Sequence, residues 1–111
     1  MQIYEHRRSQ HITAIDAIDF WIRRRGAMVI DFSVNYRIFL HDEWHPAVRY
    51  DTAHGQCLHV HRHWRGGEDI EWLERTRRMD YGDAATAALA DVRDNWQDYR
   101  RRLEVALGVP R

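Results

Sequence analysis

The chain has 111 residues, a size that buries one hydrophobic core but not two, so we expect a single domain, 1–111. Seventeen basic residues, all of them arginine, balance seventeen acidic ones, which excludes a general electrostatic attraction to nucleic acid or membrane. The single cysteine excludes an internal disulfide, and no apolar run reaches the ~18 residues of a membrane span. We therefore expect a soluble, cytoplasmic protein.

The amino-terminal third fits two patterns. Four isoleucines, at positions 12, 15, 18 and 22, would share one face of a helix, whereas the stretch 20–30 also reads as a strand that turns at Arg25-Gly26. We predict a short helix or loop first, followed by a hairpin around Arg24–Ala27.

Strict alternation of apolar and polar residues begins at Met28. Every even position from Met28 to Leu40 is apolar, and polar residues occupy most odd positions, which predicts a long half-buried strand. After the polar break "HDEW", the residues Trp44, Val48 and Tyr50 alternate with polar neighbours and predict a second strand, antiparallel to the first.

The next segment, Gln56 to Trp64, alternates once more, with Leu58 and Val60 on one side. "RGGE" at 65–68 predicts a turn because of its paired glycines, and "IEWLERTRR" is compatible with a short helix or a last strand. These patterns predict an antiparallel sheet of three to four strands.

A long helix is predicted at the carboxyl end. The segment after Asp83, which is a plausible N-cap, is rich in helix-forming residues and lacks Gly and Pro as far as Leu107. Apolar residues spaced three and four apart form one stripe along it, at Leu89, Val92, Trp96, Tyr99, Leu103 and Ala106. We therefore expect an α+β fold in which this helix packs on one face of the small antiparallel sheet.

The histidines form the most informative pattern. Five of the eight fall between His45 and His63. Because side chains two apart on a strand share a face, the predicted strand 56–64 places Cys57, His59, His61 and His63 in one row.

A metal site is one interpretation of this row. Neutral imidazole and thiolate bind zinc and similar divalent ions, and a His-x-His pair such as His59 with His61 can close on one ion. His63 and Cys57 are further candidates in the row, although its two ends are too far apart to join the same ion. A third ligand would come from Asp51, His54 or His45.

Metal-independent cleavage of RNA is a second interpretation. It requires one group to remove a proton from the 2′-hydroxyl and another to protonate the leaving oxygen, and two imidazoles suit these tasks. The acid–base pair would be His59 with His61, or His54 with either of them. Arg49 or Arg62 would stabilise charge on the phosphate. Asp51 would orient one imidazole.

The third interpretation is structural: a solvated strand face that is rich in histidine. Trp44 and Trp64 pose the same question, because tryptophans near strand ends can stack on bases but more often pack against neighbours. Composition and spacing leave these alternatives open.

Two stretches resemble known families. "EWHPAVRYDTAHG", followed by His59 and His61 and later by "NWQDYR", resembles an uncharacterised small domain family with an RYDTAHG motif. "RYDTAHG" also resembles, more distantly, the toxin of TumE–TumA toxin–antitoxin pairs, in which an Arg-Tyr-Asp-Asn-type turn precedes closely spaced histidines; Thr52 stands here at the usual Asn position.

The TumE-type resemblance implies a toxin-like protein that acts on RNA, with an antitoxin protein as its partner. The leading expectation is therefore a ribonuclease with His54, His59 and His61 as catalytic candidates and Arg49, Asp51 and Arg62 as phosphate-binding or orienting residues. The alternative is a non-catalytic module that binds protein or metal, with a homodimer as one arrangement.

Overall fold

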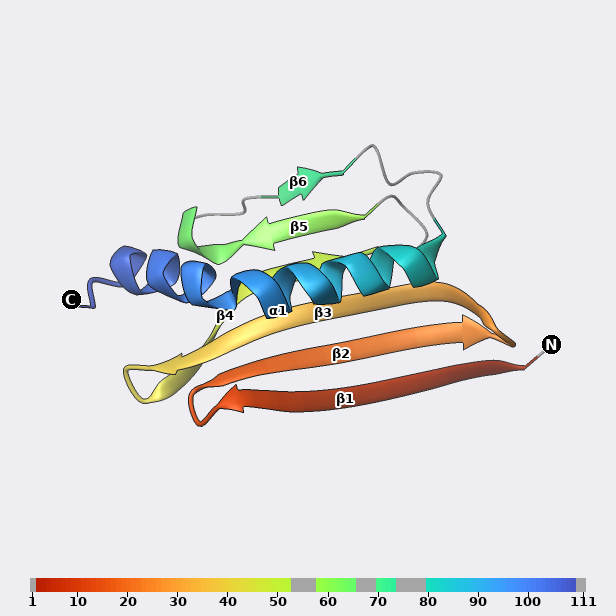
Figure 1. Ribbon diagram of the computed structural model, residues 1–111, viewed down its shortest axis with the longest axis horizontal. Helices are drawn as coiled ribbons and strands as arrows, with labels where there is room; N and C mark the ends of the chain where they lie inside the picture. Colours follow the sequence, from red (N-terminus) through yellow and green to blue (C-terminus); the bar gives the residue numbers. More distant parts are fainter. Residues whose placement is uncertain (1, 53–57, 66–69, 74–79, 110–111) are drawn as a thin grey trace.

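The computed structural model describes residues 2–52, 58–65, 70–73 and 80–109. It is an α+β fold in which one antiparallel sheet carries a single long helix on one face (Figure 1). The strands follow one another across the sheet in chain order. The elements are β1 (Ile3–Thr13), β2 (Asp16–Arg25), β3 (Met28–Leu40), β4 (Glu43–Asp51), β5 (His59–Arg62), η1 (His63–Arg65), β6 (Ile70–Trp72) and α1 (Tyr81–Ala106).

The sheet has six strands, so the expected number of three to four was too small. The short helix or loop predicted before the first hairpin was wrong, because β1 occupies that segment and pairs with β2 along almost its whole length. All of β1 except Ile12 is exposed, and a strand that buries neither face shows no alternation from which it could be predicted. The hairpin predicted around Arg24–Ala27 is confirmed, with Gly26 at φ 56°.

The long strand predicted from Met28 to Leu40 is confirmed as β3. Its even-numbered side chains from position 32 to 38 are fully buried and form the centre of the core under α1. Tyr36 contacts Trp96 and Phe32 contacts Tyr81, in both cases ring edge to ring face. The alternation in β3 therefore decides which face of the sheet the helix covers.

The second predicted strand is confirmed as β4, but Trp44 and His45 lie on the faces opposite to those that the alternation predicted. Tyr36 pairs with Val48 and Arg37 pairs with Pro46, so Ala47 is an extra residue in β4 at this point. Such a bulge reverses the alternation on either side of it. Trp44 therefore pairs with Phe39 and lies on the face opposite to Val48, contrary to the even-numbered pattern.

The third predicted strand, which carries the row of histidines, is shorter than predicted. β5 ends at Arg62, and the chain continues as one turn of 3-10 helix over His63, Trp64 and Arg65. Of the two structures compatible with "IEWLERTRR", the strand is present as β6 over its first three residues. The turns expected at "DTAHG" and "RGGE" fall largely on 53–57 and 66–69, which lie outside the described residues.

The carboxyl-terminal helix is confirmed, with an earlier start than predicted. Its N-cap is Asp80 and not Asp83: the Asp80 carboxylate accepts hydrogen bonds from the backbone N–H groups of Gly82, at 2.7 Å, and Asp83, at 3.2 Å. The helix ends before Gly108, whose φ of 74° suits glycine. No helix in the described part of the chain is long and apolar enough to cross a membrane.

Two carboxylates tie the helix to the sheet. Asp16 is fully buried, accepts a hydrogen bond from the Tyr36 hydroxyl at 2.6 Å, and pairs with Arg100 of α1 at 3.2 Å. Asp91 of α1 accepts hydrogen bonds from the hydroxyls of Tyr50 and Tyr99, each at 2.7 Å. These contacts set the position of α1 along β3 and β4 and leave the opposite face of the sheet to other residues.

Candidate functional site

The face of the sheet opposite α1, called the open face here, carries two rows of polar side chains. Residues directly opposite one another in antiparallel strands point to the same side. One row joins Asp19, Asn35, Arg49 and His61, and the next joins Trp21, Ser33, Asp51 and His59. The residues expected to carry chemistry are thus concentrated where β4 meets β5.

A compact cluster is formed by Asp51, His59 and His61. One ligand atom from each lies within 4.8 Å of the other two. The rings of His59 and His61 meet edge to face with their centroids 5.0 Å apart. His59 is only 4% exposed, while the Asp51 side chain is 25% exposed. The cluster is therefore buried at His59 and open to solvent at Asp51.

Arg49 lies at the rim of this cluster. Its Nη2 lies 3.4 Å from His61 Nε2, and its Nε lies 3.7 Å from Asp51 Oδ2. The side chain is 44% exposed, so the guanidinium remains accessible to an anion. A fork of N–H donors beside two imidazoles is an arrangement that suits a phosphate oxygen.

The imidazoles at the rim are held toward their neutral forms. Partial burial and the nearby Arg49 guanidinium lower the pKa of His61 below its ordinary value, and His59 acts in the same direction. The pKa of His63 is lowered by the same two main causes. A neutral imidazole has a ring nitrogen lone pair that can accept a proton or bind a metal ion.

The structure brings some of the other predicted residues close and separates others. His63 has left the strand, but its ring still stacks on His61 with centroids 6.3 Å apart. Arg62 is paired with Glu71 at 2.5 Å, and its partner across β4 is Val48, so it points to the helix side of the sheet. His45 donates from Nε2 to the carbonyl oxygen of Leu40, 3.1 Å away, at the β3–β4 hairpin.

His54 and Cys57 lie outside the described residues, and their predicted roles stay predictions. The motif "RYD" is split by the alternation of β4. Arg49 and Asp51 point to the open face, whereas Tyr50 points to α1 and bonds to Asp91. Burial and the Asp91 carboxylate raise the pKa of Tyr50 well above its ordinary value, so this phenol stays protonated and donates.

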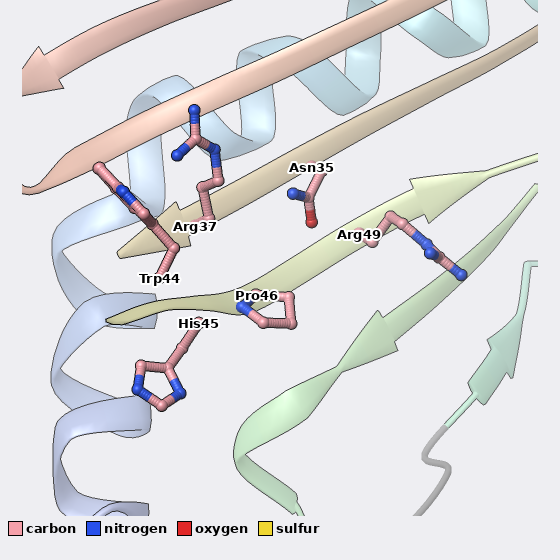
Figure 2. A pocket seen from close by; sticks show the side chains of 6 residues that line it. All are labelled: Asn35, Arg37, Trp44, His45, Pro46 and Arg49. Carbon is pink, nitrogen blue, oxygen red and sulfur yellow. The ribbon is translucent and has the colours of Figure 1, made fainter. Parts of the chain in front are cut away.

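Two open-face residues, Asn35 and Arg37, were missed as functional candidates, and they lie beside Trp44, for which base stacking and packing had been left as alternatives. They line a hollow next to Arg49 (Figure 2). Asn35 and Arg37 are visible in the sequence only as the polar side of an alternating strand. Their position beside Arg49 depends on strand register, and that of Trp44 depends on the bulge, neither of which a local pattern supplies.

Taken together, the arrangement suits two kinds of chemistry. Two imidazoles and one carboxylate match the nitrogen and oxygen ligands of catalytic divalent metal sites, in which three protein ligands leave a position open. The same imidazoles beside an arginine also match the acid–base requirements of RNA cleavage. The fold and this cluster define a small α+β protein with a histidine- and arginine-lined site on the side of its sheet opposite α1.

The chain matches, over residues 3–108, the family model described as a domain of unknown function, DUF7718, and it belongs to that family. The expected membership of an uncharacterised small domain family is thereby confirmed. No curated protein and no solved structure matches the chain significantly.

Proposed function

We propose that this protein cleaves phosphodiester bonds in RNA at the cluster of Asp51, His59 and His61. The observation that carries the proposal is the convergence of one donor atom from each of these residues within 4.8 Å, beside the accessible guanidinium of Arg49. The choice of RNA as substrate follows the resemblance of "RYDTAHG" to TumE-type toxins.

A bound divalent metal ion is the form of this chemistry that the cluster supports best. Zinc in proteins binds nitrogen and oxygen ligands at about 2.0–2.2 Å, and catalytic sites use three protein ligands. The cluster offers this number and kind of ligands, with one ligand atom from each residue within 4.8 Å of the others. An ion held there would activate a water molecule and polarise a phosphoryl oxygen. The burial of His59 favours the metal-bound form, because an imidazole that is 4% exposed is better placed to bind an ion than to reach a leaving group.

Metal-independent cleavage is the second candidate, and the contact of Arg49 with His61 supports it. In this form one neutral imidazole removes the 2′-hydroxyl proton, the resulting oxygen attacks phosphorus, and the other imidazole, which has to enter the step as an imidazolium, protonates the departing 5′-oxygen. The products are a 2′,3′-cyclic phosphate and a free 5′-hydroxyl. Arg49 would neutralise the charge that builds on the phosphate.

The test is cleavage of an end-labelled RNA pool by the purified protein, with and without EDTA. We expect the double variant His59→Ala/His61→Ala to lose about 100-fold or more of the activity, the scale typical of removing acid–base or metal chemistry. The matched control is His6→Ala/His41→Asn, which changes two histidines on β1 and in the β3–β4 turn; asparagine suits the positive φ of residue 41. This control should cleave like the wild type.

Each outcome decides a part of the proposal. Activity that is lost in EDTA and restored by metal supports the metal-bound form. Activity that survives EDTA but is lost in His59→Ala/His61→Ala supports the acid–base form. If no RNA is cleaved under any condition, or if the control pair loses as much activity as the cluster pair, the ribonuclease proposal is wrong and a non-catalytic binding module is the better account.

A toxin–antitoxin setting belongs to the same proposal. An antitoxin protein would then bind the chain and block the site, and a small neighbouring open reading frame that overlaps the gene would be expected. An isolated gene would count against this setting without affecting the chemistry of the cluster.

A further inference from the structure

A hollow of about 410 Å³ lies on the open face next to the cluster (Figure 2). Its walls come from β3 and β4. The lining residues are Asn35, Arg37, Trp44, His45, Pro46 and Arg49. It is called the β3–β4 groove below.

The groove is continuous with the candidate catalytic cluster through Arg49. The Arg49 side chain lines the groove, and its Nη2 lies 3.4 Å from His61 Nε2. A phosphate bound by this guanidinium would therefore lie between the cluster and the groove. Any group attached to that phosphate on the groove side would meet Asn35 next, because Asn35 is the cross-strand partner of Arg49.

Asn35 offers an acceptor whose hydrogen bond is missing. Its Nδ2 donates to Asp19 Oδ2 at 3.2 Å, and because a carboxylate cannot donate, this bond fixes which amide atom is which. The Oδ1 atom is buried and has no hydrogen-bond partner in the structure as described. Figure 2 shows this oxygen turned toward β4. A buried acceptor of this kind is costly unless a ligand supplies an N–H or O–H donor.

The far end of the groove presents a flat, cationic surface. The Arg37 guanidinium carbon lies 4.2 Å from the centroid of the Trp44 ring, and Arg37 Nε donates to Asp19 Oδ2 at 2.8 Å. Asp19 therefore holds both Arg37 and Asn35 in place. Trp44 is still 38% exposed. Aromatic rings and guanidinium planes are the surfaces on which proteins stack unpaired bases.

We propose that the β3–β4 groove binds one nucleotide unit, with its base against the Trp44–Arg37 pair, an N–H of the base on Asn35 Oδ1, and its phosphate on Arg49. The inference rests on the proposed function and deepens it, because it names the part of the substrate that adjoins the cleaved bond. A free nucleotide and a nucleotide within single-stranded RNA share this chemistry.

Binding of a fluorescently labelled single-stranded RNA octamer, followed by anisotropy in EDTA to prevent metal-dependent cleavage, tests the groove. The His59→Ala/His61→Ala variant is measured in parallel, because we expect it to lose both metal-dependent and metal-independent cleavage and so to leave the RNA intact during the binding measurement. We expect Trp44→Leu to weaken binding about 10-fold, the scale of losing one stacked base, and Trp44→Phe to restore most of it. Asn35→Ala should weaken binding by a smaller factor, because it removes one acceptor. The matched control is Trp21→Leu, a tryptophan on the same face but outside the groove.

Competition separates the two sources of the ligand. Displacement of the octamer from wild-type protein by adenosine or uridine 5′-monophosphate identifies a free-nucleotide site, whereas displacement only by unlabelled RNA identifies a strand-binding site. Either result supports the groove if the binding affinity is lower in Trp44→Leu than in the wild type. The inference is overturned if neither probe binds, or if Trp44→Leu and Asn35→Ala bind like the wild type while folding normally by circular dichroism.

The proposed function and the groove can fail separately. If wild-type protein binds RNA through the groove but cleaves none, the ribonuclease proposal fails and the groove stands. If Trp44→Leu and Asn35→Ala both bind and cleave RNA like the wild type, the groove fails and the cleavage site stands.

Discussion

The two faces of the sheet treat polar groups in opposite ways. On the helix side, the carboxylates of Asp16 and Asp91 each accept hydrogen bonds from hydroxyl groups and join the sheet to α1. On the open face, the amide oxygen of Asn35 lacks a hydrogen-bond partner among the described residues, and two imidazoles converge with a carboxylate and an arginine. This comparison supports the proposals above: the helix side supplies stability, and the open face offers polar groups that a ligand could bind.

The residues of the two sequence motifs, "RYD" and "NWQDYR", are divided between the helix side and the open face. In "RYD", Tyr50 serves the helix side and its neighbours serve the open face. In "NWQDYR", Trp96 packs on Tyr36, Tyr99 bonds to Asp91 and Arg100 pairs with Asp16. The second stretch therefore docks the helix, whereas two of the three residues of the first, Arg49 and Asp51, belong to the site.

Breaking the helix side should give the largest loss of stability. Asp16→Ala leaves the Tyr36 hydroxyl and the Arg100 guanidinium without their buried acceptor, which should lower the free energy of unfolding by about 3–5 kcal/mol. Urea denaturation followed by tryptophan fluorescence measures this. The matched control, Asp98→Ala, removes an exposed carboxylate paired with Arg102 and should cost less than about 0.5 kcal/mol. Equal losses in the two variants would contradict the assignment.

The open face should contribute to stability through Asp19, by a smaller and pH-dependent amount. Burial raises the pKa of Asp19, but hydrogen bonds from Arg37, Ser9 and Asn35 outweigh it and the net pKa is lowered. A lowered folded-state pKa stabilises the protein above the unfolded pKa of about 3.9, and the stabilisation is lost as pH falls through the folded value.

Asp19→Asn should therefore be less stable than the wild type at pH 7, by about 1 kcal/mol or less because the carboxylate is partly exposed. The difference should shrink below about pH 4. Urea titrations of both proteins at pH 7, 5 and 3 measure it. A difference that stays constant over this range would show that the charge of Asp19 contributes nothing.

Local patterns predicted the parts of the fold whose burial is periodic. β3 buries every second side chain from position 32 to position 38, and α1 buries one stripe, so both were predicted from spacing. β1 buries almost nothing and gave no such pattern. Asp80 and Asp83 are equally good caps by residue type, and only the bonds to Gly82 and Asp83 distinguish them.

The candidate site was predicted in part for a related reason. The spacing of His59 and His61 within one strand places them on the same face, independently of how the other strands pair. The assembly of Asp51 and Arg49 with them, and the separation of Arg62, depend on the register between β4 and β5. The position of Trp44 depends on the bulge at Ala47. Register and bulges follow from the whole sheet, so spacing within a single segment does not reveal them.

The most direct test of the open-face cluster is titration of the metal-free protein with Co²⁺, followed by visible absorbance and by competition with Zn²⁺. We predict one tightly bound ion, an affinity at least about 10-fold lower in Asp51→Ala and in His61→Ala, and nearly wild-type affinity in His63→Ala, because His63 lies outside the three-residue cluster. The absence of binding, or equal affinity in all four proteins, would contradict a metal site at Asp51, His59 and His61.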